Sequence, residues 1–87
     1  MPTPAIVQRI IAAFKQRKDD LFLKAVASEE MNNLVDVSFE AEDMLVTAKF
    51  NRADALFVQL VAVPMIEPPH DEPAVVYEIT PPESEPW

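Results

Sequence analysis

The residues that could carry out chemistry in this chain are one histidine and fifteen carboxylates. His70 precedes Asp71, but two side chains that are adjacent in sequence do not by themselves form a catalytic dyad. None of the serines lies in a context that marks an activated nucleophile. We therefore expect His70 to be a solvent-exposed loop residue, and we predict a non-enzymatic protein without catalytic residues.

Carboxylates occur side by side at residues 19–20, 29–30, 42–43 and 71–72. Such pairs could flank a glycosidic bond or hold a hard cation. They carry little specificity in a chain with fifteen acids, and the glycine turn of an EF-hand loop is missing. Zinc would have one histidine and no thiolate to bind. We predict no metal site and no cofactor.

The composition restricts both the turns and the sources of stability. The 87 residues include nine prolines, no glycine and no cysteine. Turns that need a positive φ should therefore fall on asparagine or aspartate. A chain of this size has a small core, and disulfides or metals usually supplement it. Association with itself or with another protein is the remaining source of stability.

The sequence gives only weak evidence about the cellular compartment. The absence of cysteine is compatible with the cytosol, and the N-terminus lacks the pattern of a signal peptide. The longest nearly apolar run, residues 55–66, is shorter than the roughly 20 residues of a membrane helix. We expect a soluble, cytoplasmic or virion-associated protein without membrane contact.

The charge is unevenly distributed along the chain. Residues 1–27 carry a net charge of +3, whereas residues 28–87 carry −11. The acidic part should repel nucleic acid and favour basic protein surfaces, with an attraction that salt weakens. We predict no direct binding of nucleic acid and no small-molecule substrate. Two interpretations of the acidity stay open, namely solubility and recognition.

The first 33 residues have helical character. Thr3 can cap a helix with Pro4 at its first position, and apolar residues then recur every three or four positions. This pattern predicts a helix from Pro4 to about Arg17, whose apolar face forms the core or binds a partner. Residues 21–31 form either a second helix or an extension of the first, ending at Asn32 or Asn33.

From residue 34 the apolar period changes to two. Residues 34–39 and 44–50 alternate as two strands of an antiparallel hairpin. The turn between them concentrates Glu40, Glu42 and Asp43, which are either simply solvated or docked by a basic partner. Residues 55–63 fit a strand or a helix, and we choose a strand. Its nearly continuous apolar character predicts a central or doubly covered position.

The C-terminal quarter is rich in proline and acid. Residues 64–73 should form a stiff extended connector. Residues 74–80 alternate again, and Val75, Tyr77 and Ile79 could add a strand to another chain's sheet. The tail ends in Trp87, which we expect to anchor a partner rather than to stabilise the fold. A solubilising tail is the alternative.

Together these patterns predict an α+β fold. One or two N-terminal helices pack on a small antiparallel sheet of three to four strands, followed by an extended proline-rich tail. Residues 1–63 would form the core domain, and residues 64–87 the connector, the short strand and the tail.

The predicted function is that of a protein–protein interaction subunit, an accessory or structural component of a virion or other multi-subunit particle. The alternative is an acidic inhibitor of phage or mobile-element type that blocks a basic, nucleic-acid-binding surface of a host protein. The predicted partner-binding residues are Glu40, Glu42, Asp43, Val75, Tyr77, Ile79 and Trp87.

Overall fold

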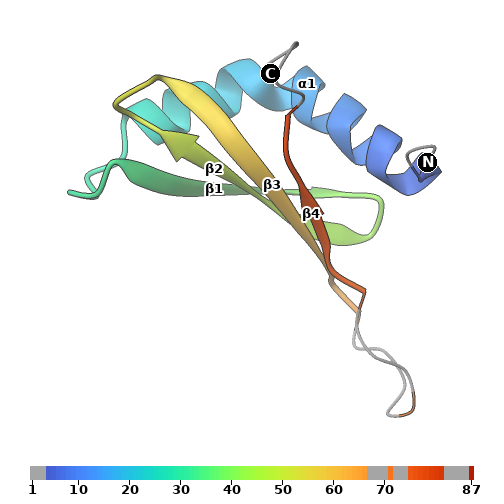
Figure 1. Cartoon of the computed structure of the whole chain (residues 1–87). Helices are drawn as coiled ribbons and strands as arrows, with labels where there is room; N and C mark the ends of the chain where they lie inside the picture. Colours follow the sequence, from blue (N-terminus) through green and yellow to red (C-terminus); the bar gives the residue numbers. More distant parts are fainter. Residues whose placement is uncertain (1–3, 67–70, 72–74, 82–86) are drawn as a thin grey trace.

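The fold is α+β, with one helix packed on one face of a four-stranded antiparallel sheet (Figure 1). The computed structural model describes residues 4–66, 71, 75–81 and 87. The elements are α1 (Ala5–Val26), β1 (Leu34–Ala41), β2 (Met44–Asn51), β3 (Leu56–Pro64) and β4 (Tyr77–Ile79). The predicted fold class is therefore confirmed. The predicted loop histidine, His70, lies outside the described residues.

The strands follow one another in the order β1-β2-β3-β4, so each pairs with its neighbour in sequence. The alternation of residues 34–50 therefore predicts the hairpin correctly, and the choice of a strand for residues 55–63 is also confirmed. β4 is shorter than expected and pairs only with residues 60–62 of β3. β3 thus has the predicted central position, between β2 and β4.

The core lies between α1 and the sheet. Its described members are apolar, and the largest fully buried side chains are Phe14, Phe50, Ile10, Leu60, Val35 and Val46. Phe14 is central: its ring lies 5.0 Å from that of Phe57 and 6.4 Å from that of Phe39, measured between centroids. Such aromatic pairs add stabilisation beyond the burial of their area.

α1 is one continuous helix, so the charged residues 17–20 do not break it. The buried stripe continues past them to Leu21 and Ala25, which keeps the whole helix on the sheet. The guanidinium carbon of Arg17 lies 5.7 Å from the centre of the Phe39 ring, so this cation covers an aromatic side chain. At the N-terminus, Pro4 is the cap residue, whereas the sequence predicts it one position further inside the helix.

The helix ends at Val26, earlier than the predicted stop at Asn32 or Asn33. The following loop is held by Arg52 from the β2–β3 connection. The guanidinium of Arg52 donates hydrogen bonds to the carbonyl oxygens of Ser28 (3.1 Å), Asn32 (2.7 Å) and Glu30. These contacts give loop carbonyls partners that a longer helix would otherwise supply.

Positive φ angles occur at Glu42, Asp43 and Ala55 among the described residues. The expectation that asparagine or aspartate would take such positions holds only for Asp43. Glu42 and Asp43 form the two-residue turn of the β1–β2 hairpin, where both central residues need a positive φ. In the β2–β3 connection, the side-chain oxygen of Asn51 instead accepts a hydrogen bond from the backbone N–H of Ala53 (2.9 Å).

Candidate functional site

The described part of the chain contains no pocket and no group of three or more histidine, cysteine, aspartate or glutamate residues that could hold a metal ion. No described helix combines the length and apolar character needed to cross a membrane. Candidate sites must therefore be sought on the surface.

The predicted acidic turn is exposed, and part of it is already engaged within the chain. The Nε atom of Arg9 on α1 lies 3.2 Å from a carboxylate oxygen of Glu42. The carbonyl oxygen of Asp43 accepts a hydrogen bond from the backbone N–H of Met65 (3.3 Å). Glu40 lies on β1 with an exposed side chain. The turn is therefore tied to both α1 and the end of β3.

The C-terminal candidates divide into exposed and buried residues. Val75 is exposed, Tyr77 is half-buried and Ile79 is buried in the core. β4, which carries Tyr77 and Ile79, pairs with β3 of the same chain. β4 is therefore an edge strand of this chain's own sheet, and its role in binding another chain stays a prediction.

Trp87 is buried in the chain's own core, with 8% of its surface exposed. Its ring centroid lies 5.4 Å from that of Phe14 on α1. Figure 1 shows the C-terminus beside the helix. Its ring is therefore not exposed for a partner as the sequence-based expectation required, and the contact with Phe14 gives it a place in the fold.

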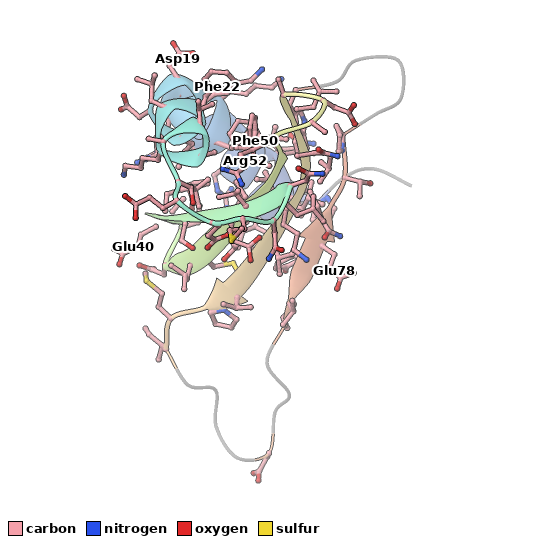
Figure 2. All side chains as sticks on the ribbon, turned by 90° about the vertical axis from the view of Figure 1, so that its left-hand side faces the viewer. Asp19, Phe22, Glu40, Phe50, Arg52 and Glu78 are labelled. Atoms are coloured by element: carbon pink, nitrogen blue, oxygen red, sulfur yellow. The ribbon has the colours of Figure 1, made fainter. Side chains whose placement is uncertain are left out.

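The face of the sheet opposite α1, which we call the open face, is not covered by any other described helix or strand. Its side chains alternate with those of the core along the strands. Its residues are Leu34, Asp36, Ser38, Glu40, Leu45, Thr47, Lys49, Asn51, Leu56, Gln59, Val61, Val63 and Glu78. Figure 2 shows Glu40 and Glu78 beneath the helix, toward opposite margins of the sheet.

The register arranges the open face into rows that cross the strands. Ser38, Thr47, Val61 and Glu78 form one row through all four strands. The hydroxyl oxygens of Ser38 and Thr47 lie 3.3 Å apart, within hydrogen-bond distance. In the row beside it, Glu40 is aligned with Leu45 and Leu45 with Val63. The centre of these two rows is thus mainly apolar, with carboxylates at the margins.

The two layers carry opposite net charge. α1 has five cations and two carboxylates, a net charge of +3. The open face has three carboxylates, Asp36, Glu40 and Glu78, and one cation, Lys49. Lys49 is aligned with Asp36, and none of the three carboxylates forms an ion pair with a described cation. The charge asymmetry of the sequence thus becomes an asymmetry between layers.

The structure brings together some predicted site residues and adds others. Asp43, Met65 and the end of β3 meet at one end of the sheet. Glu40 belongs to the open face, but its neighbours Leu45 and Val63 were not singled out by sequence reasoning. For Val63 the signal was the apolar character of both faces of β3, which predicts a central or doubly covered strand but does not identify a binding surface. Leu45 lies on β2, where no such signal was present.

Comparison of the chain with protein-family models, with curated proteins and with solved structures finds no match.

Proposed function

We propose that this protein is a non-enzymatic protein-binding subunit that joins a larger assembly through the open face. The observation that carries this proposal is that β3 is apolar on both faces, whereas one of these faces belongs to the open face. Val61 and Val63 on the open face alternate with the core residues Leu60 and Ala62. Strands that are apolar on both faces are typical of sheets covered on both sides. Among the described residues, only α1 packs on a face of this sheet, so they cover one face and leave the other open.

The exposure of this surface supports the same proposal. Leu45 is 38% exposed and Val76, two residues before Glu78, is 49% exposed. Val61 and Val63 are half-buried by their neighbours in the sheet. Contiguous apolar side chains with a polar rim are typical of surfaces that bind another protein. A partner that covers them would remove apolar area from water and stabilise a small domain.

The test is association of the full chain with proteins from its native source, identified by mass spectrometry. Val63→Glu places a charge on the open face and should abolish retention of the specific partner. The matched control is Leu23→Glu, because Leu23 is 65% exposed on the helix. It should retain the partner. If both variants retain the same proteins as the unchanged chain, the open face is not the binding surface.

The acidic inhibitor is the second candidate function. The three carboxylates of the open face, none of them in an ion pair with a described cation, favour it, because they could contact a basic surface that normally binds nucleic acid. An inhibitor of this type should compete with nucleic acid for its partner. An accessory subunit should bind its partner whether nucleic acid is present or not. Competition binding with the identified partner separates the two.

A further inference from the structure

From the arrangement of charge and apolar side chains, we infer that the occupant of the open face is a basic amphipathic helix of the partner. This inference rests on the proposed function and specifies the partner's chemistry. Its basis is that Glu40 on β1 and Glu78 on β4 stand at opposite margins, with Leu45, Val61 and Val63 between them.

The width of the face fits a helix. Neighbouring strands lie about 4.8 Å apart, so the row from Ser38 to Glu78 spans about 14 Å. An α-helix with its side chains is about 10–12 Å across. A helix lying over Val61 and Val63 would therefore have Glu40 and Asp36 on one side and Glu78 on the other.

The negative charge of the open face favours a partner with positive charge. Lysine and arginine can lay their aliphatic stems on apolar surface while the cation reaches outward to a carboxylate. A helix with an apolar stripe and cations on both flanks could thus contact the valines and both acidic margins. It would repeat on this face what α1 does on the other, where an amphipathic helix covers the sheet.

A second copy of this chain fits the face less well. Packing two open faces together would bring six carboxylates into one interface against two lysines. The exposed side of α1 carries a net positive charge, but the apolar stripe of α1 is already buried against its own sheet, so α1 of a second copy has no such stripe to lay on the open face. The repulsion between two open faces and the burial of this stripe therefore favour a different, basic chain.

The probe is a synthetic amphipathic peptide of leucine and lysine, about four helical turns long, with an acidic twin in which glutamate replaces lysine. Binding to the isotope-labelled full chain is measured by NMR titration. The lysine peptide should shift the amide signals of β1–β4, and its affinity should fall as salt is raised. The acidic twin should bind at least about tenfold more weakly.

Charge reversal on the protein completes the test. The double variant Glu40→Lys with Glu78→Lys should weaken the lysine peptide at least about tenfold. The matched control is Glu29→Lys with Glu30→Lys, since these exposed loop carboxylates lie off the face and change the net charge equally. The control should lose no more than about twofold. Equal losses in both double variants would overturn the inference, because bulk charge alone would then explain binding.

The remaining outcomes separate this inference from the proposed function. If the acidic twin binds the open face as well as the lysine peptide, or if the chain alone forms a dimer that Val63→Glu disrupts, the face binds protein but the basic helix is wrong. If neither peptide shifts the open face, the inference is overturned, and the retention experiment with Val63→Glu then decides the proposed function on its own.

Discussion

Arg52 is the residue that most clearly replaces missing secondary structure with side-chain hydrogen bonds. Its guanidinium contacts the carbonyl oxygens of Ser28, Glu30 and Asn32, and its backbone N–H donates to the carbonyl oxygen of Asn33 (2.8 Å). One side chain therefore fixes most of the loop between α1 and β1.

Replacing Arg52 with alanine should lower the free energy of unfolding by about 1–3 kcal/mol, because a charged donor of several hydrogen bonds is lost. Lysine should recover only part of this, since it lacks the planar fork. Chemical denaturation measures both. The control is Arg9→Ala, which removes an exposed ion pair with Glu42 and should cost less than about 1 kcal/mol. Equal costs for Arg52→Ala and Arg9→Ala would contradict this role.

Ala55 adopts a φ of 56°, in the left-handed region that alanine disfavours. Ala55→Gly should therefore raise the free energy of unfolding by about 1 kcal/mol, the relief of strain exceeding the added freedom of the unfolded chain. Ala53→Gly in the same connection is the matched control, because Ala53 has no positive φ. It should be neutral or destabilising. Stabilisation by both substitutions, or by neither, would show that strain at Ala55 is not the cause.

At the scale of the element, α1 is held to the sheet by its buried stripe rather than by its caps. Its N-cap is Pro4, without a side-chain hydrogen bond, and its C-terminal half contacts the sheet through Phe22, whose ring lies 5.4 Å from that of Phe50. In proteins, most of the stability of a helix comes from tertiary packing of its amphipathic face. Packing must therefore supply most of the stability of α1.

Ile10→Asp should destabilise the protein by several kcal/mol, because Ile10 is fully buried and an unpaired carboxylate there must be desolvated or neutralised. The matched control is Ala12→Asp, one half-turn away on the exposed side of α1. It should cost less than about 1 kcal/mol, mainly through the lower helix propensity of aspartate. Far-ultraviolet circular dichroism during thermal unfolding reports both. Equal melting temperatures for the two variants would mean that the stripe is not buried.

For the whole molecule, the sequence predicts the helix and the strands better than it predicts where the helix ends and which face of the sheet stays exposed. Alternation in residues 34–50 identifies the hairpin because one face of each strand is apolar. The charged residues 17–20 are compatible with a helix end or with a helix surface, and the burial of Leu21 shows that the helix continues through them. The open face was predictable only in part. Apolar residues on both faces of β3 indicate that both faces are covered, but they do not indicate which face packs against the helix.

Trp87 is the described residue of the tail that packs into the core. Trp87→Ala should lower the free energy of unfolding by about 3 kcal/mol, the lower end for a buried tryptophan, because its ring packs on Phe14 and is 8% exposed. Trp87→Phe, the matched control, should lose less stability, since it keeps an aromatic contact.

As the chain's single tryptophan, Trp87 also reports its own burial by fluorescence. Its emission should lie at shorter wavelength than that of tryptophan in water and shift on unfolding. If the emission resembles that of tryptophan in water and Trp87→Ala leaves the stability unchanged, then Trp87 is exposed and is available to anchor a partner.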